Sequence, residues 1–190
     1  FPMELEIQKA IELGMDELCF TEHSDYDVPT VVNCDYDAYF KEMEEMKEKY
    51  KGQITLKTGI EFGIQVHTTK AYEETFGQYP FDFVIFSCHQ VENKEYWRQE
   101  PQKGKTQLEY NRRYYQEILD VVKAYKDYSI LGHLDVIKRY DLNGEIELEK
   151  IKDLIEQIFE VVIADGKGIE LNTSSRAYHL KSLMPSREIL

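Results

Sequence analysis

The sequence predicts an α/β protein in which parallel strands alternate with helices. Short apolar runs recur along the chain, and segments with helical periodicity lie between them. The run FDFVIFSCH at residues 81–89 is almost wholly apolar, which is typical of a strand covered on both faces. Strands separated by helices imply parallel pairing with crossovers, so an open doubly wound sheet and a barrel of βα units both fit. No glycine-rich phosphate loop follows a strand, which weakens the dinucleotide-binding version.

The elements are expected to alternate along the whole chain. The first helix places Met3, Ile7 and Ala10 near helical spacing and ends at a glycine. Residues 148–166 carry a broad apolar stripe and also end at a glycine. Residues 91–107 are the longest irregular segment, which we expect to be a loop over a site. The expected helices are residues 3–13, 35–52, 68–77, 106–128 and 148–166, and the expected strands are 17–20, 53–62, 81–89, 129–135 and 168–175.

The composition fits a single globular domain and excludes some partners. The 190 residues are 42% hydrophobic and 31% charged, and no apolar run approaches the roughly 20 residues that span a bilayer. The net charge of -13 disfavours a nucleic-acid partner, because binding a phosphate backbone requires clustered Lys and Arg. Three widely spaced cysteines predict free thiols in a reducing cytoplasm. The first residue is Phe1, so we expect the chain to start partway through a larger protein.

Nearly every apolar strand ends on an acid or a histidine. In a parallel barrel all strand carboxyl ends open onto one face, so these groups are expected to converge there. A single histidine after a strand is more often a hydrogen-bonded structural residue, and a single glutamate could simply pair with an arginine, but several uncompensated polar groups at the end of a core would be costly. A set of histidines with a glutamate suits divalent zinc, manganese or iron. The strand ends carry Glu22 and His23, Glu61, His89, His133 and Asp135, and Glu170 and Asn172.

Other titratable residues give weaker signals. His67 and His179 do not follow strands, so neither is expected to be a metal ligand. Arg139 and Arg176 follow strand ends on the expected site face. Each could form a surface ion pair of little consequence or a fork that grips a phosphate, and both interpretations stay open on the residues alone.

Five motifs in order resemble the polymerase and histidinol phosphatase (PHP) family, most closely its histidinol-phosphatase branch. They are FTEHSD, GIEFG, SCHQV, GHLDVIKRYD and ELNTSS. The resemblance implies a distorted seven-unit, TIM-like β/α barrel with up to three divalent metals. It also implies that His23 is a ligand of the third metal, that Glu61 bridges the first and second, and that His89 and His133 hold the second. Arg139 and Arg176 resemble the arginines that hold the substrate phosphate.

The sequence also departs from the family pattern. It contains no HxH motif, which the family carries on its first strand, and no closing Asp-x-His motif. We therefore expect residues 1–190 to be a single PHP-type barrel domain that is truncated at both ends, lacking its first strand and its last units. On this view the fragment alone is an impaired enzyme, and activity comparable to that of an intact homologue would overturn the expectation.

The resemblance implies hydrolysis of a phosphate monoester. The leading expectation is a cytoplasmic histidinol phosphatase of histidine biosynthesis, with Glu61 and His23 as the catalytic candidates and a small-molecule phosphate ester as the partner. One alternative is a PHP phosphoesterase acting on nucleotides or phosphoproteins. Another is a catalytically inactive metal-binding scaffold, which the missing HxH favours. Tyr96 and Trp97 could stack on a substrate ring, although packing is their more ordinary role.

Overall fold

A five-stranded parallel sheet forms the centre of the computed structural model, which describes residues 2–190. The strands pair in the order β1-β2-β3-β6-β7, and every pairing is parallel. This order follows the sequence without the reversal that marks a doubly wound sheet, which favours the barrel type of winding. The bounds are β1 Glu17–Ser24, β2 Thr55–Gly63, β3 Phe83–Ser87, β6 Ile130–Leu131 and β7 Gly168–Ile169.

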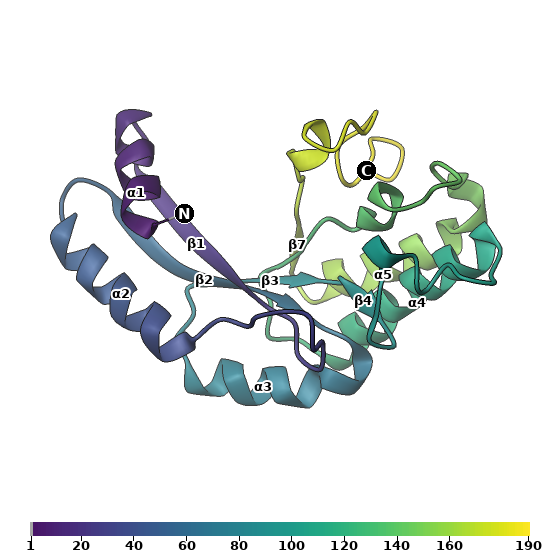
Figure 1. The fold of residues 1–190 in the computed structure, drawn as a ribbon, viewed down its shortest axis with the longest axis horizontal. Helices are drawn as coiled ribbons and strands as arrows, with labels where there is room; N and C mark the ends of the chain where they lie inside the picture. Colours follow the sequence, from purple (N-terminus) through teal and green to yellow (C-terminus); the bar gives the residue numbers. More distant parts are fainter. Residues whose placement is uncertain (1) are drawn as a thin grey trace.

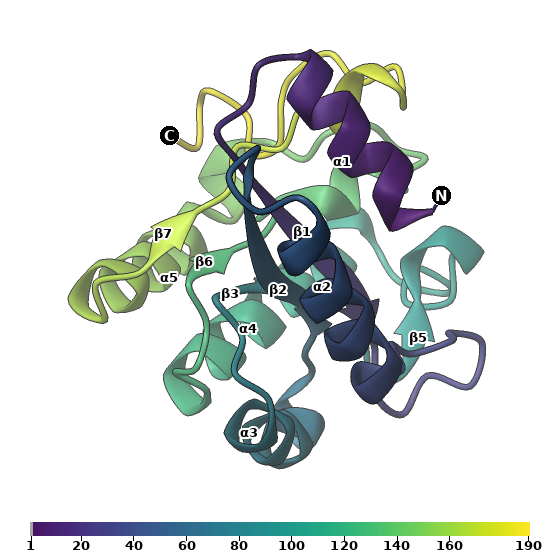
Figure 2. The ribbon, with the colours of Figure 1, turned by 90° about the vertical axis from the view of Figure 1, so that its left-hand side faces the viewer.

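Within the described part of the chain, five α-helices flank the curved sheet (Figure 1). Figure 2 shows α1 and α2 beside β1 and β2 at one end of the sheet, with α5 and β7 at the opposite end. Within residues 2–190, β1 and β7 are the two edges and do not pair with each other. The parallel pairing of the strands and the helices between them confirm the predicted α/β class. The helices are α1 Met3–Glu12, α2 Tyr36–Lys49, α3 Thr69–Gln78, α4 Gln107–Ala124 and α5 Lys152–Ala164.

Two helices begin at caps that the sequence encodes. The Asp35 side chain accepts a hydrogen bond from Ala38 N at the start of α2. At the start of α4, Thr106 and Glu109 form a reciprocal capping box, which satisfies two backbone N–H groups that a helix leaves unpaired. These caps fix where the helices start and therefore where the preceding loops end.

Several predicted elements differ in detail from the structure. The strands expected at 129–135 and 168–175 are each only two residues long, and the helix expected at 148–166 opens with a 3-10 turn before α5 begins. The segment 91–107 is not wholly irregular, because β4 Gln90–Val91 and β5 Lys94–Glu95 form a hairpin. Its two-residue turn, Glu92 and Asn93, has positive φ at both residues, as tight hairpins require.

The interior contains two apolar clusters. The larger lies between the sheet and helices α3, α4 and α5 and holds most of the fully buried tyrosines. The smaller joins α1 and α2 to β2 through Ile7, Met43 and Leu56. Both clusters support the strands whose carboxyl ends carry the candidate site. Among the described helices, none combines the length and apolarity needed to cross a membrane.

Candidate metal and phosphate site

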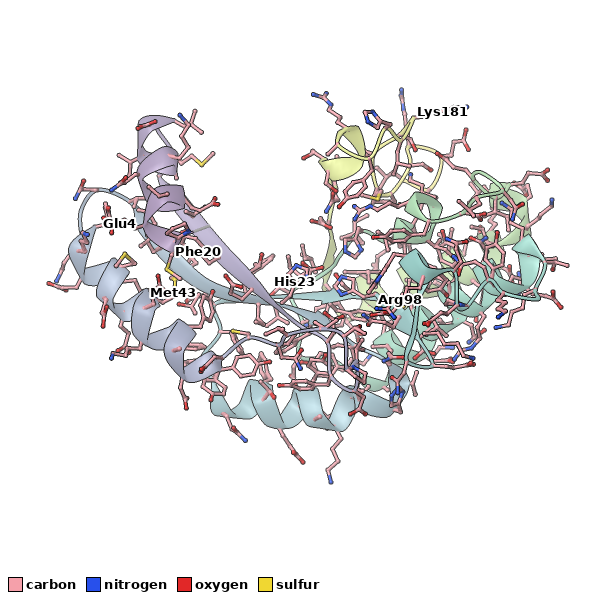
Figure 3. The ribbon with its side chains drawn as sticks, in the orientation of Figure 1. Glu4, Phe20, His23, Met43, Arg98 and Lys181 are labelled. Atoms are coloured by element: carbon pink, nitrogen blue, oxygen red, sulfur yellow. The ribbon has the colours of Figure 1, made fainter. Side chains whose placement is uncertain are left out.

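Strand register brings distant residues together at the carboxyl edge of the sheet. His23 on β1 lies directly opposite Glu61 on β2. His89 follows β3 by two residues, and His133 follows β6 by two residues. Figure 3 shows His23 near the middle of the molecule, where β1 meets the other strands. The sequence-based expectation that these four side chains converge agrees with this geometry.

Glu61 is the centre of the cluster. Its Oε1 lies 3.1 Å from His89 Nε2 and 3.2 Å from His133 Nε2, while its Oε2 lies 2.9 Å from His23 Nε2. Ser87 Oγ donates a further hydrogen bond of 2.7 Å to Oε1. Burial alone would raise the pKa of Glu61, but the hydrogen bonds from His133, His23 and His89 outweigh it and hold the pKa far below its ordinary value. Glu61 is therefore an anion with both oxygens directed at nitrogen donors.

Three of these atoms are spaced like the ligands of one metal ion. His89 Nε2 and His133 Nε2 lie 3.4 Å apart, and each lies within 3.2 Å of Glu61 Oε1. A tetrahedral zinc ion with bonds of about 2.0–2.1 Å separates its ligand atoms by about 3.3 Å. Two neutral imidazoles and a carboxylate are also a common donor set for zinc. The residues present therefore fit a divalent cation.

Asp25 extends the cluster behind His89. Its Oδ1 lies 2.7 Å from His89 Nδ1, and the aspartate is only 3% exposed. Burial would lower the pKa of His89, but the hydrogen bonds to Asp25 and Glu61 raise it to about 10. A metal ion on Nε2 would replace the proton at that nitrogen. The N–H at Nδ1 would still donate its hydrogen bond to Asp25 and keep the ring oriented. Asp25 can alternatively join His23 and His89 as a second group of potential ligands.

Sequence reasoning did not single out Asp25. The available signal was its position two residues after His23, since residues i and i+2 share a face of an extended chain. A second signal is Gly63, the last residue of the GIEFG motif. A Cβ at Gly63 would lie 1.9 Å from Asp25 Oδ1 and 2.8 Å from His89 Nδ1, so only glycine leaves room for this contact.

The other strand-end residues do not join the cluster. Glu170 Oε2 accepts a hydrogen bond of 2.7 Å from His133 N, and Glu170 Oε1 accepts one from Asn172 Nδ2. Asp135 is buried and pairs with Lys138 instead of facing the histidines. Glu22 is exposed. The expectation that all strand-end acids converge was therefore wrong for these residues, because Glu170 and Asp135 are bound to other partners and Glu22 faces solvent.

The cluster opens into a cavity of about 420 Å³. Residues that are far apart in the sequence line this cavity, including Gln90, Tyr96, Trp97, Tyr140 and Tyr178. The predicted loop over the site, residues 91–107, contributes Tyr96 and Trp97 to this wall. An aromatic wall beside a group of potential metal ligands suits a small organic molecule that carries an anionic group.

The two arginines lie in different environments. Arg139 lines the cavity, donates to Ser174 Oγ at 2.8 Å and lies over the ring of Tyr178 at 3.7 Å. Arg176 has an exposed side chain and lies outside the cavity lining. His67 lies 3.0 Å from Asn93 Oδ1, also outside the lining. Only Arg139 of the two arginines is thus placed beside the metal-ligand cluster here.

Fold and site together define a metal-binding α/β protein with its site at the carboxyl edge of a parallel sheet. The chain belongs to the PHP domain family, whose model matches residues 1–174. It is 31% identical over 171 residues to the histidinol-phosphatase of Lactococcus lactis, covering 88% of this chain and 64% of that relative. It is 26% identical over 177 residues to a probable histidinol-phosphatase of Clostridium acetobutylicum, covering 90% of this chain and 68% of that relative.

Solved structures agree with the family assignment. The Lactococcus lactis histidinol phosphate phosphatase, crystallised with zinc, L-histidinol and phosphate, matches with a TM-score of 0.83 at 30% identity. The match covers 91% of this chain and 67% of that one. A putative histidinol phosphatase from Listeria monocytogenes matches with a TM-score of 0.69 at 19% identity, over 96% of this chain and 80% of that one, and shows the fold alone. The predicted resemblance to this branch of the family is confirmed.

Proposed function

We propose that this chain is the metal-binding part of a phosphomonoester hydrolase that converts L-histidinol phosphate and water into L-histidinol and phosphate. The observation that carries the proposal is the metal-like spacing of Glu61, His89 and His133 beside a cavity that contains Arg139. The similarity to a zinc-, histidinol- and phosphate-bound relative supports the choice of substrate. A place in histidine biosynthesis follows from that substrate.

The chain's residues take distinct roles in this proposal. Glu61, His89 and His133 hold one divalent cation, and His23 on the other oxygen of Glu61 contributes to a neighbouring one. Bound cations supply Lewis-acid activation of water and of the phosphoryl group. Asp25 keeps the proton of His89 at Nδ1, so that Nε2 is free to bind a cation.

Arg139 binds the phosphoryl oxygens and neutralises their charge. Its side chain reaches the cavity from the turn that follows His133, so a phosphate could contact the cation and the guanidinium together. Arg176 is kept as a second candidate from the family resemblance. Its exposed side chain would have to turn towards the cavity to take that role.

Phosphate release from a substrate panel tests the proposal. The zinc-loaded protein is expected to hydrolyse L-histidinol phosphate in preference to p-nitrophenyl phosphate, nucleotides and a phosphoprotein. Preference for another ester would make the protein a different phosphoesterase. Tight zinc binding without hydrolysis of any ester would indicate a scaffold.

Substitution of the arginines tests their assigned role. Arg139→Ala should raise the KM for L-histidinol phosphate, and Arg176→Ala should do so if Arg176 also binds the phosphate. An unchanged KM removes the substituted arginine from the site.

Several predictions remain proposals beside this one. They are the single PHP-type domain over residues 1–190, the cytoplasmic location and the absence of nucleic-acid and membrane partners. The chain spans 64% of the length of its Lactococcus lactis relative, so activity is proposed for the protein as a whole.

A further inference from the structure

A buried ion pair lies directly behind the cavity wall that carries Arg139. Lys138 Nζ and Asp135 Oδ2 are 2.8 Å apart, and their side chains are only 6% and 4% exposed. Both residues belong to the 3-10 turn Val136–Arg139 and its N-cap, which follow His133. Burying this pair is costly, because two charges are removed from water, and removing one partner would leave the other charge buried without compensation.

The pair ties this turn to the C-terminal part of the chain. Lys138 Nζ also donates to Ser182 Oγ at 2.8 Å and to Leu183 O at 2.7 Å. Asp135 Oδ2 also accepts from Ser186 N at 2.9 Å. All three N–H donors of the ammonium group are therefore used. Two of them bond to Ser182 and Leu183, in a segment that forms no helix or longer strand.

The same segment reaches the cavity wall around Arg139. Met184 N and O exchange hydrogen bonds with Asn172, and the Met184 sulfur contacts Arg139. Ser174, which receives the hydrogen bond from Arg139, follows Asn172 and donates back to its side chain. The segment that Asp135 and Lys138 anchor thus places Met184 against Arg139 and pairs with Asn172, whose side chain in turn holds Ser174.

We propose that Asp135 and Lys138 are positioning residues that hold Arg139 in its phosphate-binding orientation. They act through the 182–186 segment and through the turn itself, whose first hydrogen bond runs from Val136 N to His133 O at 2.9 Å. The inference rests on the proposed function, because it assigns phosphate binding to Arg139. A purely structural pair would lower stability and leave phosphate affinity in the folded protein unchanged.

The test measures phosphate binding by the zinc-loaded protein. Trp97 is the one tryptophan of the sequence and lines the cavity, so its fluorescence can report the Kd for inorganic phosphate. Asp135→Asn and Lys138→Met are each expected to raise this Kd roughly tenfold, because small displacements of a positioning group are costly. KM for L-histidinol phosphate should rise in parallel, with kcat changing less. Zinc content should stay at the wild-type value.

A double variant and a matched control sharpen the test. Asp135→Asn combined with Lys138→Met should weaken phosphate binding no more than the worse single variant, because the two residues act as one unit. Lys150→Met removes an exposed ion pair with Glu147 at the same three-residue spacing on another 3-10 turn. It should leave the Kd for phosphate unchanged.

A milder variant decides the case if the charge variants do not fold. Ser182→Ala removes one of the three acceptors of Lys138 and should still raise the Kd about twofold to threefold. An unchanged Kd in folded Asp135→Asn, or in Ser182→Ala if the former is not folded, would overturn the inference, as would a wild-type protein that binds no phosphate. Phosphate binding without hydrolysis of L-histidinol phosphate would contradict the proposed function. The Kd values of the variants would then still decide whether Asp135 and Lys138 position Arg139.

Discussion

The two halves of the cavity are built in different ways. The metal-ligand half takes its residues from the ends of paired strands, so register alone places His23 beside Glu61. The phosphate half takes Arg139 and its support from 3-10 turns and irregular segments, which side-chain contacts hold together. Backbone pairing sets the positions of His23 and Glu61, whereas a network of side-chain hydrogen bonds holds the phosphate half together. Substitutions should therefore affect the two halves through different measurable properties.

The largest effect is expected at the centre of the metal-ligand half. Glu61→Gln keeps the shape of the side chain but removes the charge that faces three imidazoles. Zinc affinity should fall by more than about 100-fold, because a neutral amide replaces the one anionic ligand of the group Glu61, His89 and His133. Competition with a chelating dye measures this change. Glu22→Gln, at an exposed acid on the neighbouring strand β1, is the control and should bind zinc normally.

Backbone space around the cluster gives the next largest effect. Gly63→Ala should displace Asp25 from His89, since the new Cβ would lie 1.9 Å from Asp25 Oδ1. We expect lower stability in urea unfolding and a loss of zinc affinity of roughly 10- to 100-fold. Gly77→Ala is the matched control, because a Cβ there meets no atom within 4 Å. It lies in α3 and should be neutral or stabilise the protein by about 0.5–1 kcal/mol.

Removing only the charge behind His89 should have a smaller effect. Asp25→Asn leaves the metal-binding nitrogen in place but weakens the hydrogen bond that orients the ring. The expected loss of zinc affinity is about tenfold, at the lower end for residues that orient a ligand. Equal zinc affinity in the variant and the wild type would show that ring packing alone holds His89.

A separate prediction concerns the pH dependence of the metal-free protein. The hydrogen bonds from His89 to Asp25 and Glu61 overcome its burial and raise its pKa from 6.5 to about 10. Because the folded pKa lies above the unfolded value, the stabilisation is complete below pH 6.5 and is lost as the pH rises through about 10. Urea unfolding between these limits should show decreasing stability, and Asp25→Asn should flatten the curve. Stability that rises over this range would contradict the assigned hydrogen bonds.

The sequence predicted the metal-ligand half better than the phosphate half. Parallel strands must end on a common edge, so His23, Glu61, His89 and His133 could be grouped without coordinates. Asp25 was missed because it lies just beyond the last residue of β1, although its spacing of two residues from His23 placed it on the same face of the extended chain. A pattern of strand ends cannot show that Gly63 leaves the space that the Asp25–His89 contact needs.

The phosphate half depends on contacts that local sequence does not encode. Arg139 is oriented by Ser174, Tyr178 and Met184, which lie at least 35 positions away along the chain. The hairpin of β4 and β5 was missed because its turn residues, Glu92 and Asn93, are not the Asn-Gly pair that usually signals such turns. The hairpin matters for function, because Tyr96 and Trp97, which follow it, form part of the cavity wall.

Anomalous diffraction at the zinc edge, from crystals grown with zinc, shows whether Glu61, His89 and His133 bind a metal ion together. We expect a zinc peak bonded to His89 Nε2, His133 Nε2 and Glu61 Oε1, with bonds of about 2.0–2.2 Å. Well-ordered crystals with no peak among these three atoms, or with zinc bound only elsewhere on the protein, would rule out this metal site.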